Sequence, residues 1–452
     1  MRVMIIGLDS AAPALMFDQF WSELPTLREL VQEGVWGELT STHPPITVPA
    51  WSSMMSGLDP GELGFYGFRN RRDYSYDKYQ VANGSVVGVD RVWDILARQG
   101  RRVVLLGVPQ TYPVRPINGV VVSDFLTPST ATEYTYPAEL KTEIERVSNG
   151  YVFDVDNFRT ADKADLLRRI YAKTEKHFKV AKHLAATQPW DFFMMVEMGV
   201  DRIQHGFWSY CDPTHRNYRG GSTFESALRD YYRYVDREIG ELLSLVPKDT
   251  AVLVVSDHGA KKMDGGICIN EWLMRGGYLK VHKYPDRPRR LDELAIDWDH
   301  TVAWGEGGYH GRLFLNVKGR EPSGVVASED YELVCRELKD KIAAITDPEG
   351  RNIGSRAYRP EELYLKGVRG VPPDLTVYFG ALSWRSVGSL GLNDIYTFEN
   401  DTGPDEANHD WQGVFLANRS ATSLLGWPAG RQGGLHISQV AGLVLQMFST
   451  AR

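Results

Sequence analysis

The sequence is poor in cysteine, has no long apolar run and carries no excess of positive charge. Three cysteines occur among its 452 residues. Cys211, Cys268 and Cys335 lie too far apart along the chain for a disulfide framework or a zinc knuckle. Free thiols are typical of a reducing compartment, so we expect a cytoplasmic protein.

The other absences narrow the class of protein further. No stretch approaches the roughly 20 apolar residues that cross a bilayer, and Asp9 interrupts the first apolar run too soon for a signal peptide. We therefore expect no membrane association. The formal net charge of −7, spread without long runs, argues against dedicated nucleic-acid binding. Apolar residues make up 43% of the chain, which is enough for one large domain with insertions or for two domains.

The clearest chemical motif is Ser256-Asp257-His258-Gly259, which directly follows the apolar run Ala251–Val255. Five apolar residues without alternation predict a central parallel strand that is buried on both faces. Open α/β sheets bind ligands at the carboxyl ends of such strands, and Gly259 lets the backbone turn away at once. Asp257 and His258 are therefore candidate metal ligands. The alternative is a turn or a structural hydrogen bond.

The start of the chain repeats this plan. Residues 3–8 predict a strand, and Asp9 and Ser10 follow it at the start of a predicted helix that runs to about Gly34. Asp9 is thus either a second ligand at the same sheet edge or a helix N-cap.

Thr47 stands at the start of another predicted helix, from about Val48 to Ser56, which ends at Gly57. We expect Thr47 to be the N-cap, with Pro49 in the first turn, where its missing N–H costs nothing. A helix N-terminus offers free N–H groups and the positive end of the dipole, so this hydroxyl is suited to hold a phosphoryl group. A threonine that only caps the helix is the alternative.

A third strand, residues 191–197, leads into a helix that carries Asp201 and His205. Residues four apart share one helix face, so this carboxylate and this imidazole can bind one ion together or form a surface ion pair. Near the end of the chain, His409 precedes an apolar strand and is predicted to lie in a loop.

Two regions fall outside this pattern. Residues 61–79 are dense in aromatic and arginine side chains and predict a loop or small lid, where rings could stack and guanidinium groups could pair with phosphate. Residues 259–404 are long and irregular. We interpret them as an insertion or cap, partly returning to a core formed by residues 1–258 and 405–452.

The candidates recur at strand-to-helix edges, and they are Asp9, Thr47, Asp201, His205, Asp257, His258 and His409. If they converge, they can bind two divalent ions through mixed oxygen and nitrogen ligands, which suits Zn²⁺, with Mn²⁺ or iron as alternatives. Three carboxylates facing two dications leave a net charge of about +1, which attracts a further anionic oxygen.

The ordered motifs resemble the alkaline phosphatase superfamily, in particular its type I phosphodiesterase/nucleotide pyrophosphatase branch. The phrases GVWGEL, PPITVPAWSSMMSG and LFLNVKGREPSGVV look like the prokaryotic predicted phosphohydrolase or phosphomutase group within it. The resemblance spans nearly the whole chain. It implies an α/β/α sandwich around a mainly parallel sheet, the α/β architecture that the strand patterns also indicate.

The resemblance also implies roles for the candidate residues. One metal would be held by Asp201, His205 and His409, and the other by Asp9, Asp257 and His258. Thr47, close to both ions, would attack phosphorus to form a phosphothreonine that is then hydrolysed.

The chain departs from the branch after the nucleophile. Nucleotide pyrophosphatases usually continue with Pro-Asn-His, whereas Val48-Pro49-Ala50-Trp51 follows Thr47 here. The phosphate-holding asparagine has no clear counterpart. Arg69 and Asn70 lie near the expected place and are candidate substrate-binding residues, although they are not in register.

We therefore predict a two-metal phosphohydrolase, most simply a phosphodiesterase that acts on nucleotide-like or other small phosphodiesters. A phosphomutase of a sugar phosphate or a phosphomonoesterase on the same fold are the alternatives. A sulfatase is disfavoured because no cysteine lies near position 47. A non-catalytic, metal-stabilised binding protein is the alternative from another class. The sequence gives no oligomeric state.

Overall fold

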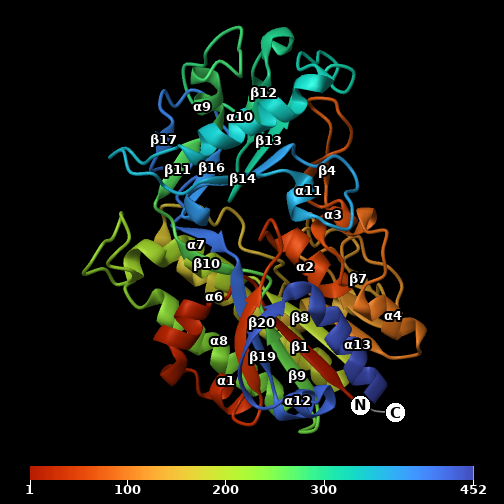
Figure 1. Ribbon diagram of the computed structural model, residues 1–452. Coiled ribbons are helices and arrows are strands. Elements are labelled where there is room, and N and C mark those ends of the chain that lie inside the picture. Colours follow the sequence, from red (N-terminus) through yellow and green to blue (C-terminus); the bar gives the residue numbers. More distant parts are fainter. Residues whose placement is uncertain (451–452) are drawn as a thin grey trace. The chain divides into compact units, whose positions relative to one another are not determined.

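A nine-stranded sheet organises the first of two units in the computed structural model, which describes residues 1–450 (Figure 1). This unit comprises residues 1–63, residues 82–260 and the chain from residue 409 on. The strands, in spatial order, are β20 (Gly430–His436), β2 (Val35–Thr40), β19 (Gln412–Ala417), β9 (Ala251–Val255), β1 (Val3–Leu8), β8 (Phe192–Glu197), β5 (Val103–Leu106), β6 (Gly119–Val122) and β7 (Thr135–Tyr136).

The centre of this sheet is parallel. Strands β9, β1, β8, β5 and β6 run in one direction. Only β19, which pairs with both β9 and β2, and the edge pair β6 and β7 introduce antiparallel neighbours among the described strands. Every residue of β1 and β9 is buried, as expected for central strands covered on both faces. The predicted α/β class with a mainly parallel sheet is confirmed.

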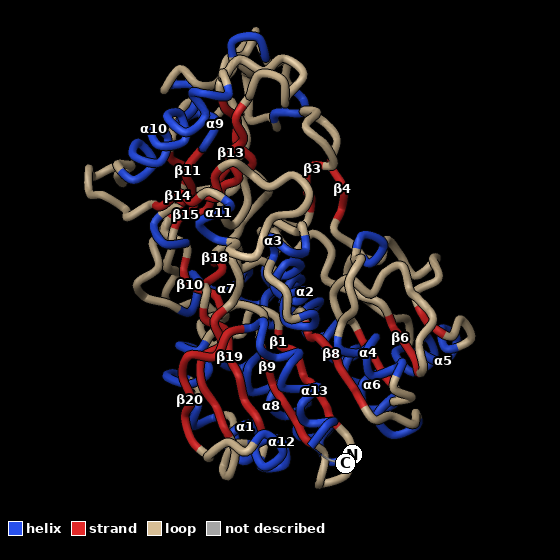
Figure 2. Tube along the Cα trace, turned by 45° about the vertical axis from the view of Figure 1, so that its right-hand side comes forward, coloured by secondary structure: helices blue, strands red, loops and turns tan. Residues whose placement is uncertain are grey.

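Helices cover both faces of the sheet (Figure 2). On one side α6 (Lys163–Thr187), α7 (Gly199–Cys211) and α8 (Ala227–Ser244) pack against one another. On the other side α2 (Thr47–Ser56), α4 (Val92–Arg98), α12 (Arg419–Leu425) and α13 (Val440–Thr450) share a core with Val3 and Ile5 of β1. The shorter helices of this unit are α1 (Pro25–Leu30), α3 (Pro60–Leu63) and α5 (Leu140–Ser148).

Three local predictions were wrong. The single helix expected up to Gly34 is broken into a π-helix at Ala14–Gln19, a 3-10 turn at Trp21–Glu23 and α1. Pro25, which has no backbone N–H to donate, begins α1 and accounts for the second of these breaks. The N-cap of α2 is Ile46, and Thr47 is its first helical residue, without a capping hydrogen bond. His409 lies in a short strand, β18 (Ala407–Asp410), which pairs with β10 (Gly259–Lys262).

The second unit comprises residues 64–81 and 261–408, so it includes a segment, 64–81, that the predicted insertion 259–404 did not contain. Its four-stranded antiparallel sheet is β12 (Ala303–Glu306), β13 (Gly311–Leu315), β15 (Leu375–Tyr378) and β14 (Arg356–Tyr358). Beside this sheet the unit contains β16 (Trp384–Val387), β11 (Gly265–Cys268), β17 (Tyr396–Thr397), the hairpin β3 (Arg69–Arg71) and β4 (Tyr79–Val81), and helices α9 (Ile269–Arg275), α10 (Tyr331–Ala343) and α11 (Pro360–Leu363). Its own apolar core lies among these elements.

Within residues 1–450, no helix combines the length and the apolar character that a membrane span requires.

Candidate active site

The carboxyl edge of the parallel strands brings the acidic candidates level with one another. Gly7 of β1 pairs with Val196 of β8 and with Val255 of β9, so Asp9 and Asp257 follow neighbouring strands at the same height. Asp201 lies in the first turn of α7, which begins two residues after the end of β8. All three carboxylates are buried, with at most 2% of each residue exposed. The strand register therefore places three acids within one small region.

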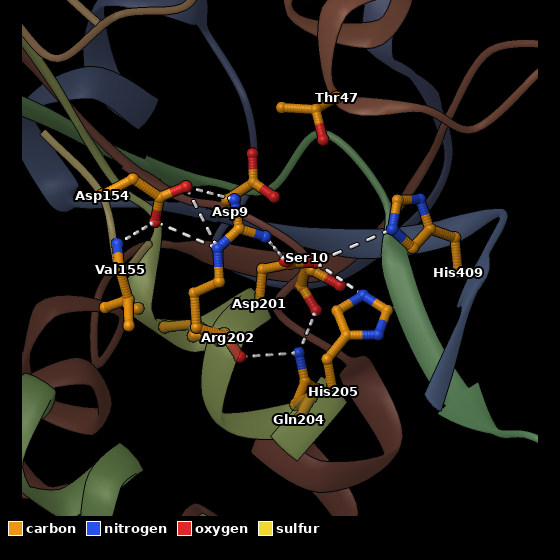
Figure 3. Close-up of polar contacts among 12 residues, drawn as sticks. Asp9, Ser10, Thr47, Asp154, Val155, Asp201, Arg202, Gln204, His205 and His409 are labelled. Atoms are coloured by element: carbon orange, nitrogen blue, oxygen red, sulfur yellow. Dashed lines mark hydrogen bonds and ion pairs between the residues drawn. The ribbon is translucent and has the colours of Figure 1, made fainter. Parts of the chain in front are cut away.

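Two groups of possible metal ligands form at this edge, and Figure 3 shows the Asp201, His205 and His409 side chains of the first. The first contains Asp201, His205 and His409, and the second contains Asp9, Asp201 and His258; in each group the ligand atoms lie within 4.8 Å of one another. Asp201 belongs to both. Its Oδ1 lies 3.2 Å from His205 Nε2 and 3.7 Å from His409 Nε2.

Asp257 is placed beside the second group. Its Oδ2 lies 3.2 Å from His258 Nε2, and its Oδ1 accepts a hydrogen bond from the backbone N–H of Ser10. His258 Nε2 also lies 3.9 Å from Asp9 Oδ1. The structure thus gathers the six acidic and imidazole candidates, with Asp201 between the two groups rather than in one alone.

Backbone carbonyl groups fix the orientation of two imidazoles. His409 Nδ1 lies 2.9 Å from the Pro45 carbonyl oxygen, and His258 Nδ1 lies 3.0 Å from that of Gly259. A carbonyl oxygen only accepts, so each Nδ1 carries the proton and each Nε2 faces the carboxylates as a possible ligand atom. The two rings stack with centroids 3.8 Å apart, and burial lowers the pKa of His258 to about 4. Neutral imidazole is the form that binds metal.

The three buried carboxylates repel one another in their charged forms unless cations lie beside them. Burial and the charge of Asp201 raise the pKa of Asp9 to about 8, and burial and the charge of Asp9 raise the pKa of Asp257 well above its usual range. Burial also opposes ionisation of Asp201, but His205 and Arg202 outweigh it and hold its pKa well below the usual range. Asp9 Oδ1 and Asp257 Oδ2 are buried and accept no hydrogen bond from the described residues. Orphaned oxygens beside neutral imidazoles fit divalent cations.

Thr47 supplies the hydroxyl of the site. It is 3% exposed, and its Oγ1 lies 3.5 Å from His258 Nε2. Its position at the start of α2 places the hydroxyl at the positive end of that helix. The structure therefore brings the predicted threonine to the acids and imidazoles.

Sequence reasoning missed two partners of the acids. Trp51 Nε1 donates a 2.9 Å hydrogen bond to Asp9 Oδ2; its position one turn after Thr47 on the same helix was the available signal. Arg202 donates to Asp201 Oδ2, and its Nε lies 3.0 Å from Asp154 Oδ1 (Figure 3). Asp154 is in a segment, residues 151–159, whose pattern predicts only a connecting loop, so nothing in the sequence indicated it.

The two substrate-binding candidates belong to the second unit. Asn70 is used locally, since its Oδ1 accepts from the Tyr66 N–H at 2.8 Å and its Nδ2 donates to the Gly67 carbonyl at 3.1 Å. The guanidinium of Arg69 lies over the Tyr79 ring. A substrate-binding role for Arg69 and Asn70 stays a prediction.

A buried ion pair supports the segment between β8 and α7. Lys173 Nζ lies 2.9 Å from Glu197 Oε1, and both side chains are at most 1% exposed. The same carboxylate oxygen accepts from the Gly199 N–H at 2.8 Å, and the Glu197 carbonyl accepts from the Asp9 N–H at 3.0 Å. The ion pair therefore supports both the segment that carries Asp9 and the start of the helix that carries Asp201.

Replacing Lys173 by Met should lower the free energy of unfolding by about 3–5 kcal/mol, because it leaves Glu197 charged and buried without its cation. Urea denaturation measures this. The double variant with Glu197→Gln should recover part of the loss, since it removes the uncompensated charge. A single-variant loss below about 1 kcal/mol would show that the pair contributes no more than a surface pair.

Comparison with known proteins places the chain in a family. The model for type I phosphodiesterase / nucleotide pyrophosphatase matches residues 3–405. Human ectonucleotide pyrophosphatase / phosphodiesterase 5 is similar in structure, with a TM-score of 0.56 at 11% sequence identity, over 99% of this chain and 95% of the other.

The murine protein of the same name gives a TM-score of 0.54, again at 11% identity over 99% of this chain and 95% of the other. Its inactive variant in complex with AMP gives 0.55, with the same identity and the same coverage of both chains. No curated protein matches the chain. The family match covers most of the sequence, and the chain therefore belongs to the type I phosphodiesterase/nucleotide pyrophosphatase family of phosphoester hydrolases.

Proposed function

We propose that the chain is a two-metal phosphodiesterase in which Thr47 is the nucleophile. The observation that carries the proposal is the position of the Thr47 hydroxyl, 3.5 Å from His258 Nε2 and beside two groups of buried acidic and imidazole side chains. A hydroxyl in this setting is typical of a nucleophile that divides phosphoester hydrolysis into two displacements.

In the first displacement, Thr47 Oγ1 forms a bond to phosphorus while the bond from phosphorus to the leaving oxygen breaks. In the second, water attacks the phosphothreonine, and the bond between Oγ1 and phosphorus breaks to release the product. The first turn of α2 presents its positive end to the phosphoryl oxygens. The murine complex with AMP supports the assignment of Thr47 as the nucleophile, because that inactive variant has alanine in place of a threonine.

The residues fit two divalent ions. Asp201, His205 and His409 would hold one, and Asp9, Asp257 and His258 would hold the other. Asp201 belongs to both groups of possible ligands and would contribute to both ions. Bound ions of this kind supply Lewis acidity, which stabilises the developing negative charge and favours the ionised hydroxyl. The nitrogen and oxygen donor set suits Zn²⁺, and Mn²⁺ or iron would also be accepted.

Paired substrates test the proposal. The protein is treated with a chelator, reloaded with Zn²⁺ or Mn²⁺, and assayed with bis-p-nitrophenyl phosphate and with p-nitrophenyl phosphate. We expect release of p-nitrophenol that depends on metal and is faster from the diester. Faster release from the monoester would identify a phosphomonoesterase, and bound metal without turnover of either compound would favour a binding protein.

Replacing Trp51 by Phe should lower kcat/KM about 10-fold and weaken metal binding to a similar extent, because Asp9 loses the donor that orients its carboxylate. Competition with a metal-binding dye and steady-state assays measure the two effects. Trp93→Phe is the matched control, since Trp93 is buried in the same core on another helix. Equal effects of both substitutions would attribute the loss to packing alone.

A further inference from the structure

The second unit contains a cavity of about 460 Å³ whose lining comes from that unit alone. Residues of the β3–β4 hairpin, of the segment 290–312 and of the segment 385–402 form its wall. A cavity of this size accommodates one small molecule. None of the acidic and imidazole residues described above lines it, and Arg69 is the one predicted substrate-binding residue that does.

One side of the cavity is a rigid aromatic wall. Tyr76 stacks on Trp298 with ring centroids 3.7 Å apart and planes 2° from parallel. The edge of Trp304 contacts both rings, at 5.5 and 5.1 Å. The Tyr76 hydroxyl donates to Asn316 Oδ1 at 2.7 Å and accepts from the Ser323 N–H at 3.0 Å. These contacts fix the rings before any ligand arrives, so the wall is preorganised.

The positive and negative side chains that line the cavity are equal in number. Four arginines and four carboxylates line the cavity, and no lysine or histidine is among the described lining residues. Several neutralise one another directly, as Arg312 does with Glu306. A lining without net charge favours a neutral ligand over a phosphate or a metal ion, because either ion would enter without a compensating charge.

Two buried donors in the lining lack partners within residues 1–450. Arg385 is 5% exposed; its Nη1 lies 3.2 Å from Asp405 Oδ2, while its Nε has no hydrogen-bond partner. Ser386, 1% exposed, likewise has an Oγ without a partner. Ser389 Oγ donates to Asp401 Oδ2 at 2.8 Å, also in the lining. Unpaired buried donors are rare in folded proteins, but these two atoms lie below the water-accessible surface. The polar groups that a ligand can reach are the exposed ones of the lining, such as the paired side chains of Arg290 and Asp292.

We propose that this cavity binds a neutral sugar ring. The C–H face of a pyranose packs against aromatic planes, and its hydroxyl groups both donate to carboxylates and accept from guanidinium and serine groups, which this lining offers in equal measure. Neither a base nor a sugar can enter between Tyr76 and Trp298, whose ring centroids are 3.7 Å apart. On the outer faces of these rings a nucleobase fits less well, because it has no hydroxyl groups to offer to the carboxylates of the lining. The proposal does not depend on phosphoester hydrolysis.

Ligand-observed NMR and calorimetry test the proposal on the full chain, with methyl α-D-glucopyranoside, methyl α-D-mannopyranoside and methyl β-D-galactopyranoside as probes. Adenosine and inorganic phosphate are titrated in parallel. We expect at least one glycoside to bind with a Kd of about 10 mM or tighter, and phosphate not to bind at a site whose occupation depends on Trp298. Absence of binding by all three glycosides would overturn the proposal.

Three variants place the binding in the cavity. Trp298→Ala should weaken it at least about 10-fold by removing an aromatic face, whereas Trp272→Ala, at a half-buried tryptophan of the same unit outside the lining, should leave it unchanged. Arg290→Ala removes an exposed guanidinium of the lining that pairs only with the exposed Asp292 among the described residues, so it should weaken glycoside binding several-fold without lowering Tm. Glycoside binding that survives both lining substitutions, or tighter Trp298-dependent binding of adenosine, would refute the sugar site.

Discussion

Replacing Thr47 by Ala should lower turnover of a diester substrate by about 10⁴-fold or more, because the substitution removes the oxygen that we propose attacks phosphorus. Bound metal should remain, since both groups of acidic and imidazole side chains are intact in this variant. Steady-state assays of metal-loaded protein give the first quantity, and elemental analysis gives the second. A Thr47→Ala protein that keeps turnover within tenfold of the parent would refute the assignment of the nucleophile.

Thr47→Ser is the matched control for this substitution. Serine retains the hydroxyl and loses only a methyl group from a buried position, so its turnover should stay within about tenfold of the parent, the difference arising from the freer rotation of its side chain. An acid quench with a phosphorus-labelled substrate adds an independent readout. The parent and the serine protein should carry covalent label, and the alanine protein should carry none.

The sequence was sufficient for much of the first unit because its signals are local. Uninterrupted valine-rich runs identified the central strands, and parallel strands end at one edge, so Asp9 and Asp257 could be placed together from the sequence alone. The pairing of Trp51 with Asp9 was not accessible in this way. It depends on how α2 is rotated against the sheet, and that rotation is decided by packing of the whole helix face rather than by the residues around Trp51.

The second unit was harder to predict because its structure depends on contacts between distant segments rather than on local patterns. Its sheets join short strands from distant parts of the sequence; β11, for example, pairs with β16 in parallel and with β17 in the opposite direction. Strands of two to five residues carry little periodicity. Residues 64–81 group with this unit although a long stretch of the first unit, residues 82–260, separates them from residue 261.

Gly259, in the first unit, was predicted as a turn residue. A Cβ at this position would lie 2.0 Å from the Gln412 carbonyl oxygen. The close approach of the neighbouring strand is therefore what excludes other residues here.

Replacing Asp201 by Asn should reduce metal binding at both positions. Asp201 is the one residue common to the two groups of possible ligands, and asparagine keeps its volume while removing the negative charge that a dication requires. We expect bound Zn²⁺ to fall from about two ions per chain to below one, with a loss of affinity of at least about 100-fold. His205 belongs to only one group, so His205→Ala should leave about one ion bound.

Asp154→Asn is the control that separates metal binding from charge pairing. Asp154 and Asp201 share the guanidinium of Arg202, yet Asp154 belongs to neither ligand group. If Asp201 acts as a ligand, the Asp154 variant should keep both ions although it loses the same kind of ion pair. Equal metal loss in the two variants would mean that Arg202 pairing organises the site and that Asp201 does not bridge two ions. Two ions retained by Asp201→Asn would exclude the bridging arrangement directly, since the carboxylate that the two groups share would then be unnecessary.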